Sequence, residues 1–182
     1  MNKNLGELFR RRAYITPDVE AIVDLAKDQR FSYAQVNERI NALGHSLAAR
    51  GVKRGDRVAM LLFNGIEFID TFYAAAKLGA VAVPLNWRLV ADELAFILKD
   101  CGATSLIYGV EFIDAVADLH DRGGAATDIT NWIEVGPADK RQVWADPYDS
   151  LISEGDTAEP DCPSDNDDLM FIMYTSGTTG LP

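Results

Sequence analysis

The residues with the clearest chemical potential stand at the end of the printed sequence, where an apolar run changes abruptly into hydroxyl residues and glycines. The run is Leu169–Tyr174, and it is followed by Thr175, Ser176, Gly177, Thr178, Thr179 and Gly180. Backbone N–H groups in such a loop can turn inward to form an anion site, and the hydroxyls can donate to phosphate oxygens. Because glycine also lets the backbone approach closely, these six residues predict a loop that binds polyphosphate.

Two better-known phosphate-binding patterns do not fit this stretch. No lysine follows Gly180, so it is not a P-loop, and Gly177 lacks the leading Gly-x-Gly pair of the dinucleotide fingerprint. A cluster of Ser, Thr and Gly is also what an ordinary turn looks like, and the loop alone leaves that alternative open. The apolar run before it shows no polar alternation, which predicts a strand buried on both faces.

Nine consecutive residues, Tyr174–Pro182, resemble the phosphate-binding signature of the acyl-activating, or adenylate-forming, enzymes. This superfamily includes acyl-CoA synthetases, luciferases and the adenylation domains of peptide synthetases. A Lys-Gly pair normally follows the proline in that family, whereas the printed sequence ends at Pro182. The resemblance implies that the six loop residues embrace the β- and γ-phosphates of ATP.

Two earlier stretches carry the same resemblance. Residues 31–39 are similar to the family's Thr/Ser-Tyr-x-Glu-Leu segment, with Gln35 and Val36 in place of Glu and Leu. Residues 78–89 are similar to its Gly-Ala-x-x-x-Pro-Leu-Asn segment, and their Leu-Asn-Trp-Arg-Leu form resembles fatty acyl-CoA synthetases. Val90 stands where the family usually has a Thr or Ser helix cap, so we expect the next helix to fray at its start.

The resemblance implies a ligase that uses a carboxylic acid, ATP and coenzyme A, with Mg²⁺ bound to the nucleotide. The acid is converted to an acyl-adenylate and then to a thioester. The family's loop lysine, adenine and ribose segments, magnesium-binding glutamate and C-terminal catalytic lysine have no counterpart among these 182 residues. We therefore expect residues 1–182 to be the N-terminal portion of the AMP-binding domain, with no catalytic residue or metal ligand of its own and no activity alone.

Two alternatives to a fatty acyl-CoA synthetase stay open. The first is another adenylate-forming branch, such as an aryl-CoA ligase, a luciferase-like oxidase or a carrier-protein loader. The second is a non-catalytic interaction module that has kept the fold. The acyl pocket lies mainly downstream in this family, so the sequence leaves the acyl chain length open.

Helical and extended patterns alternate in the rest of the chain. Helices are predicted over residues 5–13, 32–50, 65–78, 92–99 and 112–122. Strands are predicted over residues 57–63, 80–83, 105–108 and 132–135, with a hairpin over residues 21–31. Such alternation predicts an α/β fold, with a mostly parallel sheet and helices on both faces. Ser32 with Gln35, and Asn64 with Glu67, have the spacing of helix capping boxes.

Composition and charge exclude several classes of protein. The chain carries 28 acidic and 17 basic residues, a formal net charge of −11, which argues against nonspecific nucleic-acid binding. No apolar run approaches membrane-spanning length. Cys101 and Cys162 lack metal-ligand spacing and predict no disulfide, which favours a cytoplasmic protein. Residues 153–167 predict an exposed acidic loop, and a sheet without its remaining strands exposes apolar edges through which copies of the chain could associate.

Overall fold

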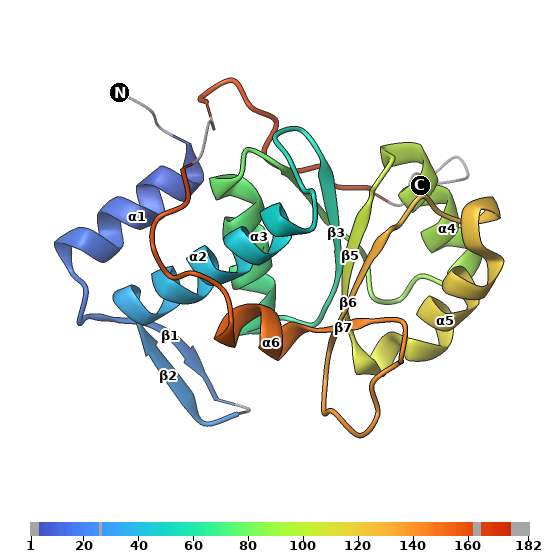
Figure 1. The fold of residues 1–182 in the computed structure, drawn as a ribbon, viewed down its shortest axis with the longest axis horizontal. Coiled ribbons are helices and arrows are strands. Elements are labelled where there is room, and N and C mark those ends of the chain that lie inside the picture. Colours follow the sequence, from blue (N-terminus) through green and yellow to red (C-terminus); the bar gives the residue numbers. More distant parts are fainter. Residues whose placement is uncertain (1–3, 26, 162–164, 176–182) are drawn as a thin grey trace.

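The computed structural model describes residues 4–25, 27–161 and 165–175. A parallel sheet of five strands lies between two layers of helices (Figure 1). Its strands are β3 (Arg57–Leu61), β4 (Val81–Pro84), β5 (Ser105–Gly109), β6 (Asn131–Val135) and β7 (Asp146–Pro147), in the spatial order β4-β3-β5-β6-β7. A separate antiparallel hairpin is formed by β1 (Glu20–Asp24) and β2 (Gln29–Ser32).

The helices cover both faces of the sheet, as the sequence predicts. They are α1 (Leu5–Ile15), α2 (Tyr33–Ala49), α3 (Ile66–Lys77), α4 (Ala91–Cys101), α5 (Ile113–Arg122) and α6 (Tyr148–Ser153). Single 3₁₀ turns at Val110–Phe112 and Gly123–Ala125 flank α5. In Figure 1, α1, α2, α3 and α6 lie on one side of the sheet, and α4 and α5 lie on the other.

Alternating side chains on the strands build two cores. Val58 and Met60 of β3 point into a first cluster shared with α2 and α3, which includes Ile40 and Leu43. Ala59 and Leu61 of the same strand point into a second cluster shared with α4 and α5, which includes Leu98 and Leu119. Successive residues of a strand face opposite sides, so apolar runs such as residues 57–61 predict burial on both faces.

One of the two predicted capping boxes is correct. Ser32 Oγ accepts from the Gln35 N–H at 3.3 Å, and Gln35 Oε1 accepts from the Ser32 N–H at 2.8 Å, which closes the start of α2. The box predicted for Asn64 and Glu67 is wrong, because Gly65 is the N-cap of α3 and forms no side-chain cap. Glu67 instead forms an ion pair with Lys27 in the hairpin turn.

The start of α4 is better held than its apolar cap predicts. Val90 cannot cap with its side chain, but its N–H donates to Glu93 Oε2 at 3.0 Å. Glu93 thus provides half of a capping box without a Ser or Thr at the cap. No helix among the described residues has the length and apolar character needed to cross a membrane.

Candidate functional site

One of the six residues of the predicted phosphate loop belongs to the part of the chain that the structure describes. Thr175 is exposed and directly follows the apolar run. Ser176, Gly177, Thr178, Thr179 and Gly180 lie outside the described residues. The phosphate-binding role of the six therefore stays a prediction, and the geometry available concerns the segment that delivers them.

The apolar run does not form the doubly buried strand that its composition predicts. Phe171 makes a single parallel bridge with Ala82 at the outer edge of β4. Two backbone hydrogen bonds close it, from the Ala82 N–H to Met170 O at 3.0 Å and from the Ile172 N–H to Ala82 O at 2.9 Å. The run has a neighbouring strand on one side only, so its other edge is uncovered in the described chain.

The side chains of the run alternate as in a strand at the edge of a sheet. Ile172 and Tyr174 pack against the second core cluster, beside α4. Leu169, Phe171 and Met173 are 58%, 40% and 60% exposed. Phe171 also meets Phe72 of α3, with ring centroids 6.1 Å apart. Apolar composition alone therefore predicted burial for both sets of side chains, while the edge position buries one.

Polar contacts hold both ends of this run. Arg54, in the turn before β3, donates to Asp168 Oδ1 from Nε at 2.8 Å and from Nη2 at 2.6 Å. The Asp165 N–H and the Arg54 guanidinium lower the pKa of Asp168. At the other end, the Tyr174 hydroxyl donates to Asp100 Oδ2 of α4 at 2.5 Å. Burial and this bond raise the pKa of Tyr174, which keeps the hydroxyl protonated.

An aromatic cluster lies just beyond the carboxyl ends of three neighbouring strands. Phe63 follows β3, Trp87 follows β4 and Phe112 follows β5. The Phe63 ring centroid lies 5.4 Å from that of Trp87 and 5.0 Å from that of Phe112, and the Arg88 guanidinium lies 4.5 Å from the Trp87 ring. Ligands of α/β proteins bind beyond the carboxyl ends of parallel strands, so this half-exposed cluster lies on the edge where a substrate is expected.

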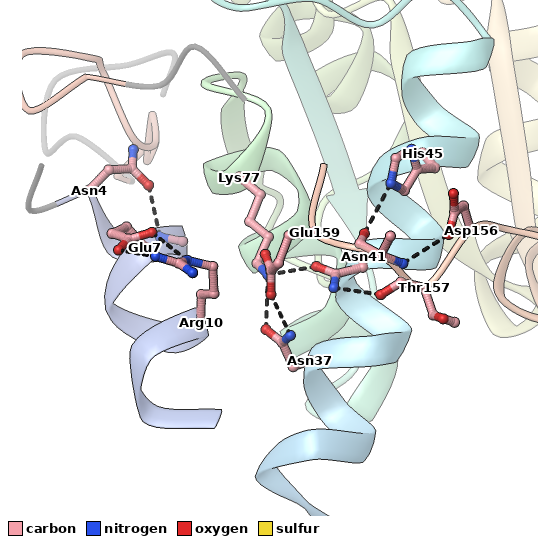
Figure 2. A network of polar contacts seen from close by, with 12 residues as sticks. Asn4, Glu7, Arg10, Asn37, Asn41, His45, Lys77, Asp156, Thr157 and Glu159 are labelled. Carbon is pink, nitrogen blue, oxygen red and sulfur yellow. Dashed lines mark hydrogen bonds and ion pairs between the residues drawn. The ribbon is translucent and has the colours of Figure 1, made fainter. Parts of the chain in front are cut away.

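Residues 156–160, here called the strap, cross the outer surface of α2 within the predicted acidic loop. Asn41 Nδ2 donates to Thr157 O at 2.8 Å, and His45 Nε2 lies 3.0 Å from Ala158 O. Asn37 Nδ2 donates to Glu159 Oε1 at 2.6 Å. Asn37, Asn41 and His45 are spaced by four and form one stripe along α2, as Figure 2 shows. The backbone of the strap and the Glu159 carboxylate are thus tied to α2.

Lys77 lies at the centre of this network (Figure 2). Its side chain is 4% exposed, and its ammonium donates to Asn37 Oδ1 at 2.8 Å, Asn41 Oδ1 at 2.6 Å and Glu159 Oε2 at 2.6 Å. The three donors of the ammonium therefore have three oxygen acceptors. Sequence reasoning missed this residue, because a lysine in the last turn of a helix is typical of a solvated, dipole-compensating position.

The strap also forms one wall of a cavity of about 440 Å³ between α1 and α2. Arg10, Asn37, Glu38 and Glu159 supply its charged and polar lining. Arg10 is already paired with Glu7, so the lining carries no excess of positive charge for an anion. Among the residues that the structure describes, no group of three His, Cys, Asp or Glu side chains is placed to hold a metal ion.

Comparison with known proteins gives a consistent picture along the chain. A family model described as AMP-binding enzyme matches residues 9–182. The long-chain-fatty-acid–CoA ligase FadD13 of Mycobacterium tuberculosis is 43% identical over 183 residues, which cover 99% of this chain and 34% of that protein. A feruloyl-CoA synthase of an Amycolatopsis species is 35% identical over 181 residues, which cover 100% of this chain and 32% of that protein.

A solved structure agrees with the fold as well as with the sequence. The crystal structure of the anthranilate CoA ligase AuaEII in complex with anthranoyl-AMP superimposes with a TM-score of 0.91 at 26% identity. The match covers 100% of this chain and 34% of that one. The chain thus spans about a third of the length of the curated relatives it matches.

Proposed function

Because this chain belongs to the AMP-binding enzyme family, we propose that it is the N-terminal portion of an AMP-forming acyl-CoA ligase. The observation that carries the proposal is 43% identity to a long-chain-fatty-acid–CoA ligase along 99% of the chain. That identity, together with the Leu85–Leu89 segment, supports a fatty acid as the substrate. A cytoplasmic location belongs to the proposal and is supported by Cys101, which is a free thiol among the described residues.

The proposed reaction has two steps. A carboxylate oxygen of the acid attacks the α-phosphorus of ATP, the bond to the β-phosphate oxygen breaks, and pyrophosphate leaves. The thiolate sulfur of coenzyme A then attacks the acyl carbon, and AMP leaves with the pair of electrons of the broken C–O bond. In this scheme the chain supplies binding and orientation, and it holds no nucleophile or general base for either step.

The loop Thr175–Gly180 acts on the charge that builds up in the first step. Backbone N–H groups and hydroxyls directed at the β- and γ-phosphate oxygens stabilise that charge as pyrophosphate departs. Mg²⁺ would neutralise and orient the same phosphates when bound. Magnesium usually binds through substrate phosphates, waters and one or two carboxylates, so the nucleotide itself would supply much of its coordination.

An aryl-CoA ligase is the second candidate. It is favoured by 35% identity to a feruloyl-CoA synthase and by the close superposition on an anthranilate CoA ligase that holds an aromatic acyl-adenylate. In both candidates the same loop binds the same phosphates, and the difference lies in the acid. A panel of fatty and aromatic acids therefore separates them.

The test compares this chain with a longer polypeptide from the same reading frame. Acid-dependent exchange of labelled pyrophosphate into ATP is expected for the longer polypeptide and not for the 182-residue chain. In the longer polypeptide, Thr175→Val is expected to raise the ATP KM, while the matched control Thr130→Val, at an exposed threonine outside the loop, is not. Absence of exchange with every fatty and aromatic acid would refute the ligase proposal.

A further inference from the structure

Few backbone hydrogen bonds hold the segment that precedes the predicted phosphate loop to the sheet. Residues 168–174, here called the delivery segment, share with β4 the two hydrogen bonds made by Ala82. Leu169, Phe171 and Met173 are exposed, so packing on that side contributes little. A single bridge leaves the register to side chains, and the packing of Ile172 and Tyr174 against the second core cluster fixes which face of the segment is buried. Contacts at the two ends of the segment add to that packing and set where Thr175 begins.

Two side-chain contacts bracket the delivery segment at its first and last residues. Asp168, 11% exposed, receives two hydrogen bonds from the Arg54 guanidinium, in a charge-assisted arrangement. Tyr174 donates to Asp100, and its ring packs beside α4. Arg54 and Asp100 come from two different parts of the sheet framework, the turn before β3 and the end of α4.

We propose that Arg54 and Asp100 are positioning residues for the nucleotide, because they fix the two ends of the segment that carries Thr175. The inference rests on the proposed function and adds to it two residues outside the glycine- and hydroxyl-rich motif. With both ends held, the segment cannot slide along β4, and the first loop residue keeps its place relative to the sheet. Loss of the contact at either end is expected to shift Thr175 without changing any residue that binds phosphate.

A merely structural role would give a different result. An ion pair with an exposed partner and a single exposed hydrogen bond each contribute little to global stability, so loss of either contact is expected to act locally on the delivery segment. The Ile172 N–H reports this directly, since it is bonded to Ala82 O at 2.9 Å. Amides of β3 and β5 in the middle of the sheet report global opening and serve as the internal reference.

The first experiment measures amide hydrogen exchange on this chain, with no nucleotide present. Arg54→Met removes two hydrogen bonds at a half-exposed ion pair and Asp100→Ala removes one, and each is expected to speed exchange at Ile172 by roughly two- to tenfold, with β3 unchanged. Asp100→Asn keeps an acceptor for Tyr174 and is expected to stay near the wild-type rate. Arg122→Met is the matched control, because it removes a surface arginine paired with Asp92 and Asp118.

The second experiment uses the longer ligase polypeptide and separates the inference from the proposed function. Arg54→Met and Asp100→Ala are expected to raise the ATP KM roughly two- to tenfold and to leave the KM for the acid unchanged. An unchanged ATP KM, or equal acceleration of exchange at Ile172 and in β3, would overturn the positioning role. If the wild-type polypeptide shows no ATP-dependent activity, the proposed function itself fails, whatever the variants do.

Discussion

Lys77 and Glu159 lie 82 residues apart in sequence, yet their charged groups meet at 2.6 Å where α3 ends against the strap. Burial lowers the pKa of Lys77, and the neighbouring Glu159 offsets part of that effect. Burial raises the pKa of Glu159, but hydrogen bonds from Asn37 and Lys77 outweigh it and leave this pKa below its ordinary value. The three oxygen acceptors around Lys77 Nζ match a charged ammonium, and removing one partner of the pair leaves the other partly buried without its counter-charge.

Lys77→Met is expected to release the strap while leaving the helices in place. Methionine keeps the aliphatic stem, on which the close packing of Gly6 against Lys77 depends, and removes the ammonium. Proteolytic cleavage within residues 156–160 should become about tenfold faster or more, the effect of losing hydrogen bonds to a charged group. Lys99→Met is the control, since Lys99 and Asp128 form an equally short but exposed pair. An unchanged rate of cleavage in the strap would contradict its dependence on Lys77.

A second buried charge on α3 faces α6. Asp70 Oδ2 accepts from the Arg39 guanidinium at 2.9 and 2.6 Å and from the Tyr148 hydroxyl at 2.8 Å. Its other oxygen, Asp70 Oδ1, is buried with no partner in the described structure. Burial raises the pKa of Asp70 from 3.8 to about 6, because Arg39 and Tyr148 compensate the lost hydration only in part.

Asp70 is therefore expected to make stability fall as pH rises from about 4 to about 6. Its folded pKa lies above its unfolded pKa, so the folded state binds more protons in that window and loses stability as they leave. A shift of this size corresponds to roughly 3 kcal/mol at most. Urea unfolding of wild type and Asp70→Asn at several pH values measures it, because the difference between them isolates Asp70. A difference that is constant from pH 4 to 7 would contradict the raised pKa.

The alternation of α and β in the chain was predictable because each element carries its own periodicity. The stripe Val36, Ile40, Leu43 and Leu47 defines α2 without reference to any other element, and all four residues are fully buried. The run at residues 57–61 likewise needs both faces covered, and the structure covers both. The capping box predicted for Asn64 was wrong because an N-cap residue also needs an extended backbone conformation. In this structure Gly65 has that conformation and is the N-cap.

The polar contacts that organise the site could not be predicted in the same way. Lys77 and Glu159 have no pattern in common, and their meeting depends on how α2, α3 and the strap pack together. Asp70 is placed among the apolar residues of α3, and the sequence does not reveal that Arg39 and Tyr148 donate hydrogen bonds to one of its two oxygens. The spacing of Asn37, Asn41 and His45 by four was a visible signal of one polar stripe, but not of its partner.

Close approach of Gly155, the residue before the strap, to α2 gives a further expectation. A Cβ at this position would lie 2.3 Å from Ala42 O and 2.7 Å from Leu151 O, both backbone atoms. Gly155→Ala is therefore expected to lower the free energy of unfolding by about 1–3 kcal/mol, the cost of overpacking. Gly124→Ala is the matched control, because nothing lies within 4 Å of its Cβ, and it should change stability by less than about 0.5 kcal/mol. Equal urea midpoints for the two variants would contradict the close approach.

The 182-residue chain is expected to bind ATP weakly, with a Kd above roughly 1 mM in calorimetry. Its formal net charge is −11, and no lysine or arginine occurs after Arg141, so long-range electrostatics oppose a triphosphate. Glu159 of the strap is paired with Lys77, and the cavity beside it is lined by both signs of charge. The predicted loop Thr175–Gly180 contains no lysine or arginine of its own, so its backbone N–H groups and hydroxyls are expected to carry the binding. Since added salt screens the repulsion between exposed charges, a modest rise in ionic strength should strengthen ATP binding. Micromolar affinity, or weakening of the affinity with salt, would show that positive groups dominate the site.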